Sequence, residues 1–126
     1  PLRGICLGMQ LLFERSAEGD TAGLGILAGN VERLVAAPGR PVPHMGWNTV
    51  EPLRDDPLLE GIAAGEHFYF VHSYAARPSA STLATADYGG PLVAFAARDN
   101  FRGVQFHPER SGSAGARLLA NFLRLS

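Results

Sequence analysis

Residues Gly4 to Gln10 constrain the fold of this chain more than any other stretch, because they hold its only cysteine. Glycines stand two positions to either side of Cys6, which gives the Gly-x-Cys-x-Gly pattern of a nucleophile elbow with sulfur in place of the usual serine oxygen. In an elbow a strand ends in a sharp turn and enters a helix, and the crowded backbone excludes bulky neighbours. The stretch therefore predicts a strand over 2–5, a nucleophile at its tip and a helix over 7–15.

Two interpretations of the cysteine are open from this stretch alone. The elbow places the thiol of Cys6 at a helix N-terminus, where free backbone N–H groups and the helix dipole favour the reactive thiolate. Alternatively, a lone cysteine after an apolar residue is a small buried hydrophobe. The flanking glycines and the polar Gln10 one turn further on favour the nucleophile. A nucleophilic cysteine needs a base, so the rest of the chain must supply one.

Composition indicates one globular domain and gives no sign of a nucleic-acid or membrane partner. The 126 residues are 46% hydrophobic and 18% charged, and the net charge of −1 favours neither nucleic acid nor a membrane surface. No apolar run approaches the about 18 residues that span a bilayer. A single cysteine cannot form an internal disulfide, which fits a cytoplasmic protein. The chain begins with Pro1, just before the elbow, and we interpret residues 1–126 as the C-terminal part of a single domain.

The remaining pattern predicts a run of strands enclosed by helices. Apolar and aromatic residues predict strands over 30–35, 49–53, 67–74, 82–88, 92–97 and 104–106, and a short helix over 56–61. The strand over 67–74 is apolar on both faces, which predicts that it is covered on both sides. The spacing of Ala114, Leu118 and Phe122 predicts an amphipathic helix over 113–125. This order predicts an α/β layered fold with a mixed sheet.

The tripeptide His107-Pro108-Glu109 is expected to supply the base for Cys6. An imidazole accepts a thiol proton near neutral pH, and a carboxylate that accepts the other ring N–H fixes the tautomer. The alternative is a capping or surface histidine at the end of a strand. Together with an elbow cysteine about one hundred residues earlier, the tripeptide predicts a Cys-His-Glu triad.

The sequences Gly-Ile-Cys-Leu-Gly-Met-Gln at 4–10 and Gly-Val-Gln-Phe-His-Pro-Glu at 103–109 resemble the class I, triad-type glutamine amidotransferases. The resemblance implies a flavodoxin-like three-layer α/β/α fold with a mixed sheet, its N-terminal strands missing from this chain. It implies that Cys6 attacks the side-chain amide of glutamine, with His107 and Glu109 completing the triad. The N–H of Leu7 would be one oxyanion donor, and a Gly-rich loop upstream of the chain would supply the other.

Three further stretches, at 43–48, 69–74 and 110–111, resemble one branch of this family, whose members pass ammonia to a cyclase subunit in a heterodimer of histidine biosynthesis. The resemblance implies that glutamine is held by two side chains and three backbone segments: Gln10 and Glu18, and His72, Ser73 and Tyr74. A carboxylate can pair with an α-ammonium, and an amide can donate and accept. Without the resemblance, Glu18 would be interpreted as a solvated loop charge.

The resemblance also places four residues at the contact with the cyclase: Met45, Trp47, Tyr69 and Arg110. Aromatic residues and arginine dominate interface hot spots, although Trp47 is equally interpretable as core. His44 is expected to be a hydrogen-bonded structural residue. His67 and His72 lie five positions apart on a strand and face opposite ways, so they predict no metal site.

Neither a metal nor a cofactor is implied, and glutamine is the expected small-molecule substrate. Three functions stay open at this stage. The first is a glutaminase that feeds a cyclase. The second is another Cys-His-Glu glutaminase or a γ-glutamyl hydrolase, and the third is an inactive fragment.

Overall fold

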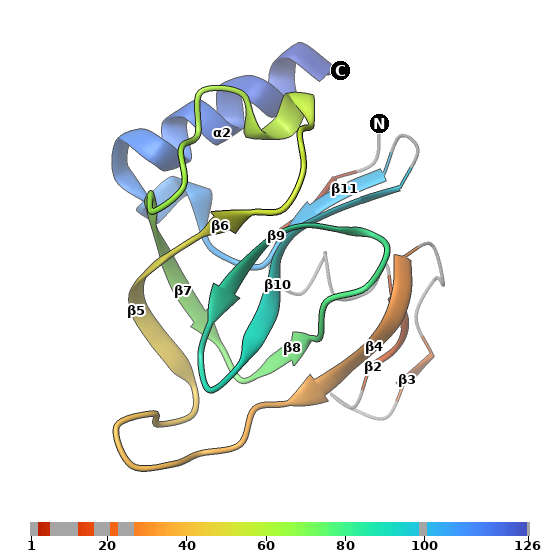
Figure 1. Cartoon of the computed structure of the whole chain (residues 1–126), viewed down its shortest axis with the longest axis vertical. Helices are drawn as coiled ribbons and strands as arrows, with labels where there is room; N and C mark the ends of the chain where they lie inside the picture. The colour runs from red at the N-terminus through yellow and green to blue at the C-terminus, as the bar shows by residue number, and fades with distance from the viewer. Residues whose placement is uncertain (1–2, 6–12, 17–20, 23–26, 99–100, 126) are drawn as a thin grey trace.

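The computed structural model describes residues 3–5, 13–16, 21–22, 27–98 and 101–125. Their elements are mostly strands, with one long helix at the C-terminal end (Figure 1). In chain order they are β1 (Arg3–Ile5), β2 (Phe13–Ser16), β3 (Thr21–Ala22), β4 (Leu27–Arg33), β5 (His44–Thr49), β6 (Glu51–Pro52), the 3-10 helix η2 (Pro57–Leu59), β7 (His67–His72), β8 (Tyr74–Ala76), β9 (Thr82–Asp87), β10 (Pro91–Arg98), β11 (Phe101–Val104), the 3-10 helix η3 (Pro108–Arg110) and α2 (Gly112–Leu125).

The strands of the described part form three sheets. The largest has the order β1-β11-β10-β9-β6, and a second has the order β3-β2-β4-β8. Strands β5 and β7 pair with each other as an antiparallel ribbon. In the largest sheet β1 and β11 are parallel and the other pairs are antiparallel. The α/β class and the mixed sheet are therefore confirmed.

The core lies between the β5–β7 ribbon, the largest sheet and helix α2. Four aromatic rings meet at its centre: Phe68, Phe70, Phe95 and Phe106 are all fully buried, with ring centroids 4.2–5.7 Å apart for the contacting pairs. Helix α2 presents Ala114, Leu118 and Phe122 to this core, as its sequence spacing predicts.

A buried asparagine fastens helix α2 to the loop around η2. The side chain of Asn121 donates hydrogen bonds of 2.8 Å to the carbonyls of Leu58 and Glu60, and the residue is 1% exposed. Figure 1 shows η2 lying directly beside α2. Leu58 is fully buried, so its carbonyl needs the hydrogen bond that Asn121 donates, whereas the carbonyl of exposed Glu60 also accepts from Nε of Arg117 at 3.0 Å.

The strands predicted over 49–53 and 104–106 are displaced: the structure has β5 at His44–Thr49, β6 at Glu51–Pro52 and β11 at Phe101–Val104. The prediction for residues 7–15 is wrong in kind. Residues 13–15, expected at the end of a helix, belong to strand β2, which lies between β3 and β4. The sequence predicts no strand between residues 16 and 29, yet β3 lies there and β4 begins at Leu27. Pairing with strands elsewhere in the sequence overrides the local helical periodicity here. Residues 6–12, the remainder of the expected helix after Cys6, lie outside the described residues.

The strand predicted over 67–74 is two strands, and only one of its faces is buried. Strand β7 buries Phe68, Phe70 and His72, whereas Tyr69 and Val71 are half-buried. The prediction of cover on both sides is therefore wrong for β7. The chain then bends at Ser73 and continues as β8, which pairs with β4 in a different sheet.

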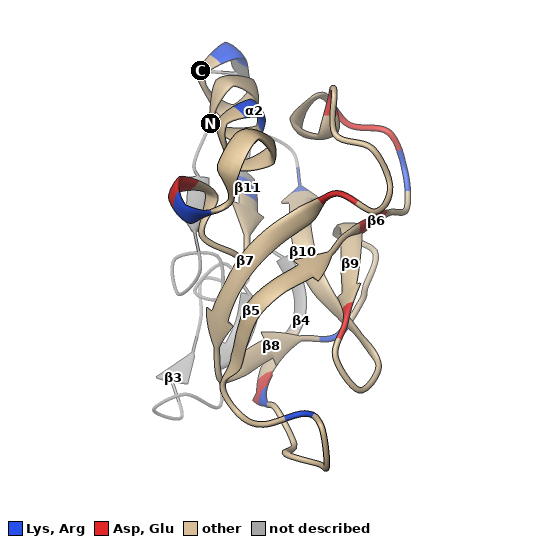
Figure 2. Cartoon of the chain, turned by 90° about the vertical axis from the view of Figure 1, so that its left-hand side faces the viewer, with Lys and Arg blue, Asp and Glu red and all other residues tan. Residues whose placement is uncertain are grey.

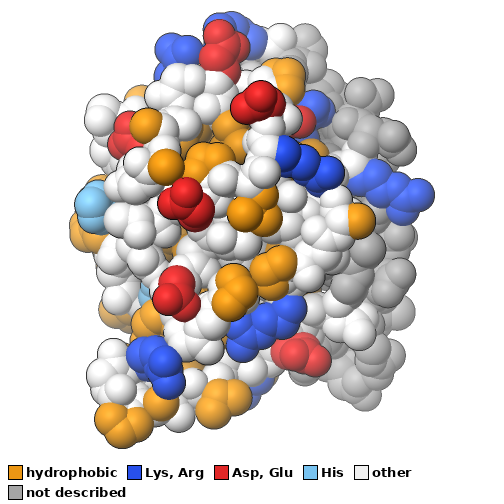
Figure 3. Space-filling model, viewed as in Figure 1, with side chains coloured by type: hydrophobic (Ala, Val, Ile, Leu, Met, Phe, Trp, Pro, Cys, Tyr) orange, Lys and Arg blue, Asp and Glu red, His pale blue; other side chains and the backbone are white. Residues whose placement is uncertain are grey.

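The described surface mixes charges of both signs. On the face shown in Figure 3, the basic and acidic side chains are interspersed among apolar ones. Among the described residues, no helix is both long and apolar enough to cross a membrane.

Candidate active site

The site begins at the end of β11, where the chain leaves the core through buried Gln105 and Phe106. His107 follows, and Pro108 starts the short helix η3. Nδ1 of His107 lies 3.3 Å from Oε2 of Glu109, and the two side chains are 29% and 60% exposed. A carboxylate in this position orients the ring with its proton on Nδ1, which makes Nε2 the basic nitrogen.

Backbone contacts fix His107 against strand β7. Its N–H donates to the carbonyl of Tyr69 at 2.9 Å. The hydroxyl of Ser111 donates to the carbonyl of His107 at 2.6 Å and accepts from the N–H of Tyr69 at 2.9 Å. Ser111 is 2% exposed, so this bridge between η3 and β7 is shielded from water.

Helix α2 packs on the same turn so closely that one of its positions admits only glycine. A Cβ added to Gly115 would lie 2.0 Å from the carbonyl oxygen of Pro108 and 2.9 Å from Cβ of Ser111. The amide of Gly115 also donates to the carbonyl of Ser111 at 3.1 Å. The missing side chain therefore allows the helix to support the turn that carries His107 and Glu109.

Strand β1 is the neighbour of β11, the strand that leads to this turn. It pairs in parallel with β11, with Ile5 aligned with Val104. In the sequence, Cys6 is the next residue after Ile5, and His107 comes three residues after Val104. The expected site residues Cys6, Leu7, Gln10 and Glu18 themselves lie outside the described residues.

The three residues expected along the substrate backbone lie where the chain changes sheets. The carbonyl of Ser73 accepts from the N–H of Leu34 at 2.8 Å, just beyond the end of β4. The ring of His72 reaches over Ser73, with Nδ1 2.9 Å from the carbonyl of Tyr74. Hydrogen bonds to the carbonyls of Ser73 and Tyr74 therefore help to hold the bend.

His44 is a hydrogen-bonded structural residue, as expected. Its Nδ1 lies 2.9 Å from Nε2 of His72, and its Nε2 lies 3.3 Å from the amide nitrogen of Asn48. Burial and the neighbouring His72 lower the pKa of His44 from 6.5 to about 4. Burial likewise lowers the pKa of His72 to about 4, against the raising effect of its bond to the Tyr74 carbonyl. His67, at the other end of β7, is exposed, so the two histidines do face opposite ways.

An exposed aromatic face adjoins the turn at His107, and we define it as Met45, Trp47, Tyr69 and Arg110. Met45 is 62% and Trp47 55% exposed, so the core interpretation of Trp47 is wrong. Trp47 is aligned with Tyr69 across the ribbon, and their rings meet edge to face at 5.8 Å. The guanidinium of Arg110 lies 4.4 Å above the Tyr69 ring. Figure 2 shows β5 and β7 side by side with η3 next to them.

Sequence reasoning assigned no structural role to Ser111 or Gly115, which support the turn at His107. The available signal is a pair of small residues four apart, one just before the C-terminal helix and two positions after Glu109, the other in the first turn of that helix. Such spacing places both on one helical face and predicts a close approach to another element.

Comparison with known proteins decides the family. The family model described as "Glutamine amidotransferase class-I" matches residues 1–125. The chain belongs to the class I glutamine amidotransferases. Two solved structures of glutamine amidotransferases, one of them from Thermotoga maritima, share its fold with TM-scores of 0.65 and 0.62. They are 23% and 20% identical to it, and the match covers 98% of this chain in each case and 59% and 45% of theirs.

Curated relatives are more similar in sequence. Two proteins named "Imidazole glycerol phosphate synthase subunit HisH", from Mannheimia succiniciproducens and Xylella fastidiosa (strain Temecula1), are each 54% identical over 98% and 99% of this chain. The matched region is 63% and 62% of their own length. The chain therefore spans less than two thirds of the length of these relatives.

Proposed function

We propose that this amidotransferase is the glutaminase subunit of an imidazole glycerol phosphate synthase, which hydrolyses glutamine and passes ammonia to a cyclase subunit in histidine biosynthesis. The observation that carries the proposal is the His107–Glu109 pair at 3.3 Å, beyond a strand that is parallel to the strand preceding Cys6. Parallel strands direct their carboxyl ends to one edge of a sheet, which supports a meeting of the cysteine and the base. The 54% identity to the two relatives supports the choice of complex.

In the proposed reaction, Nε2 of His107 takes the proton from the thiol of Cys6. The thiolate attacks the side-chain carbonyl carbon of glutamine, and the backbone N–H of Leu7 stabilises the oxyanion of the tetrahedral intermediate. The C–N bond breaks as His107 returns the proton to the leaving nitrogen, which departs as ammonia. Water then attacks the thioester with His107 as base and releases glutamate and the thiol. Throughout the reaction, the carboxylate of Glu109 accepts a hydrogen bond from Nδ1–H of His107.

Substrate recognition is proposed for the residues that the family resemblance implies. Glu18 pairs with the α-ammonium of glutamine, and the amide of Gln10 forms hydrogen bonds with polar groups of the substrate. The backbone of His72, Ser73 and Tyr74 lies along the bound glutamine. The two hydrogen bonds that hold the bend at Ser73 support this role, because a preorganised backbone binds a ligand without first paying the entropy of ordering.

The aromatic face is proposed to contact the cyclase. It combines two exposed residues of β5, Met45 and Trp47, with a stacked arginine, the composition of an interface hot spot. Arg110 belongs to the same short helix as Glu109, and Tyr69 shares a hydrogen bond with His107. A partner on this face would therefore touch the elements that position the base.

We also propose that the protein works in the cytoplasm.

The test measures glutamate release by the full-length protein, with and without the cyclase, from glutamine and from a γ-glutamyl peptide. We expect hydrolysis of glutamine only, and a faster rate in the complex. Preferential cleavage of the γ-glutamyl peptide would replace the proposal with a γ-glutamyl hydrolase, and no hydrolysis of either would indicate an inactive protein.

A matched pair of variants tests the partner surface separately. Trp47→Ala should weaken cyclase binding by at least about 10-fold, as truncation of a hot-spot residue does. Val35→Ala is the control, because Val35 is 81% exposed and belongs to no part of the aromatic face. Equal cyclase affinity for the two variants would remove Trp47 from the interface.

A further inference from the structure

The contact between His44 and His72 is a buried histidine pair that the reaction sequence leaves unused. The two residues are 3% and 7% exposed and lie opposite each other in the β5–β7 register. Nδ1 of His44 is 2.9 Å from Nε2 of His72. A buried contact between two titratable rings is costly unless both are neutral and one donates to the other.

The groups at the two ends of the pair set the direction of every hydrogen bond in it. The carbonyl of Tyr74 can only accept, so Nδ1 of His72 carries its proton and Nε2 of His72 accepts. His44 must then donate from Nδ1 and accept at Nε2, where the Asn48 amide lies. The amide of Asn48 has this orientation because its oxygen accepts from the N–H of Thr49 at 2.8 Å. Both rings are therefore neutral, with their protons on Nδ1.

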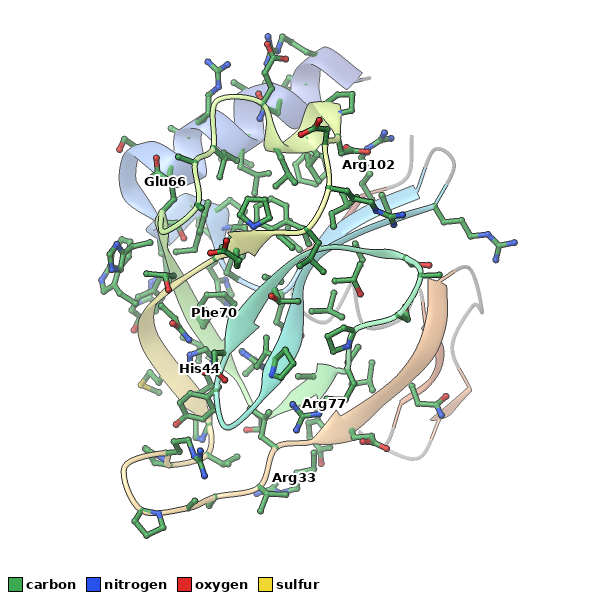
Figure 4. The ribbon with its side chains drawn as sticks, viewed as in Figure 1. Arg33, His44, Glu66, Phe70, Arg77 and Arg102 are labelled. Carbon is green, nitrogen blue, oxygen red and sulfur yellow. The ribbon has the colours of Figure 1, made fainter. Side chains whose placement is uncertain are left out.

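Packing holds the first ring of the pair in place. His44 is stacked between Phe70 and Tyr88, with ring centroids 4.8 Å and 4.1 Å away and interplanar angles of 19° and 20°. Figure 4 shows His44 beside Phe70 at the inner side of the ribbon. The low pKa that burial imposes on both histidines keeps them neutral at pH 7, which this chain of hydrogen bonds requires.

The far end of the pair reaches the bend between β7 and β8. The ring of His72 donates to the carbonyl of Tyr74, two residues further on, and so closes over Ser73. The hydrogen bond from Leu34 holds the carbonyl of Ser73 from the neighbouring sheet. The two contacts together fix the path of the backbone as it leaves one sheet and joins the next.

We propose that His44 and His72 are positioning residues for glutamine: through the donated proton on Nδ1 of His72, the pair holds the backbone of Ser73 and Tyr74 in the conformation that binds the substrate. The inference rests on the proposed function, because that function places glutamine along this backbone. It goes further by assigning the two side chains a role in substrate affinity. A residue without a donor at Nδ1 would leave the Tyr74 carbonyl without this bond.

Two substitutions of similar size separate positioning from general stability. In His72→Asn, the side-chain amide can stand where Nδ1 stands and still donate to the Tyr74 carbonyl. In His72→Gln, the longer side chain carries its amide toward the position of Nε2. With the full-length protein and the cyclase, we expect the KM for glutamine to rise about 10-fold in His72→Gln and less than about threefold in His72→Asn, with kcat little changed in both. His67→Ala, at the exposed end of the same strand, should keep the wild-type KM.

The outcomes distinguish this inference from the proposed function. If the wild-type complex hydrolyses glutamine and His72→Gln keeps the wild-type KM, the positioning role is refuted while the proposed function stands. If the wild-type complex releases no glutamate, both fall. Should the variants fold poorly, nitrogen NMR of the wild-type imidazoles decides the matter. Neutral rings protonated on Nδ1 at pH 7 support the inference, and a His72 ring protonated on Nε2 overturns it.

Discussion

Replacing Gly115 with alanine tests the link between the fold and the site. The added Cβ would stand 2.0 Å from the carbonyl oxygen of Pro108, a backbone atom that cannot rotate away. Because Cβ atoms do not approach such an atom closer than 3.0 Å, helix α2 and the Pro108 turn must separate by about 1 Å. Pro108 lies between His107 and Glu109, so the displacement reaches both members of the pair.

The expected cost combines two opposing effects. Overpacking typically destabilises a protein by about 1–3 kcal/mol, and a clash with backbone belongs at the upper end of that range. Alanine in place of glycine stabilises a helix by about 1 kcal/mol. The net loss in the free energy of unfolding should be about 2 kcal/mol. In the full-length enzyme, a shift of about 1 Å at the base should lower kcat about 100-fold.

Urea denaturation and steady-state glutaminase kinetics measure the two effects. Ser113→Ala is the control, because Ser113 is an exposed residue of the same helix, and it should change the free energy of unfolding by less than about 0.5 kcal/mol. A Gly115→Ala variant as stable as the wild type, with unchanged kcat, would refute the argument that this close approach positions His107.

Other contacts lead to three further predictions. Asn121→Ala should lower the free energy of unfolding by about 2 kcal/mol, because the carbonyl of buried Leu58 loses the bond that Asn121 donates, whereas the carbonyl of Glu60 keeps its bond from Arg117; an effect below about 0.5 kcal/mol in urea denaturation would contradict this. The pKa values of His44 and His72 are about 4 in the folded protein and 6.5 without burial, so between pH 4 and 6.5 the unfolded chain binds more protons than the folded protein. The free energy of unfolding should therefore fall as pH drops from 6.5 to 4, by up to about 1.4 kcal/mol per pH unit for each histidine. A free energy of unfolding that does not change with pH in that window would exclude the effect. His107→Ala should abolish glutamine turnover whereas Glu109→Ala should only reduce it, and wild-type kcat in Glu109→Ala would remove the carboxylate from the triad.

The parts of the fold that follow from local pattern were predictable from the sequence. Helix α2 was predicted within one residue of its start because Ala114, Leu118 and Phe122 repeat with helical spacing and all pack into the core. The strand at Phe13–Ser16 was not predictable in this way. It is stabilised by pairing with β3 and β4, and the helical periodicity of residues 7–15 contains no information about that pairing.

The candidate site likewise has one part that follows from nearby residues and another that depends on the fold. The His107–Glu109 contact follows from two residues that are near neighbours in the sequence and so needs no knowledge of the fold. The His44–His72 contact joins residues 28 positions apart and depends on the register of two strands. The predicted strand began at Thr49, five residues too late to reveal that His44 faces His72. The exposure of Trp47 was likewise undecidable, because tryptophan serves both cores and interfaces.

The central claim is that Cys6 carries the substrate as a thioester, with His107 as its base. The most direct measurement mixes the full-length complex with glutamine labelled in its carbon chain, quenches in acid during turnover and maps the label by peptide mass spectrometry. The account predicts a glutamyl group on Cys6 in the wild type and none in Cys6→Ala, which should also fail to release glutamate. Glutamate release that persists in Cys6→Ala, or a label on a different residue, would contradict it.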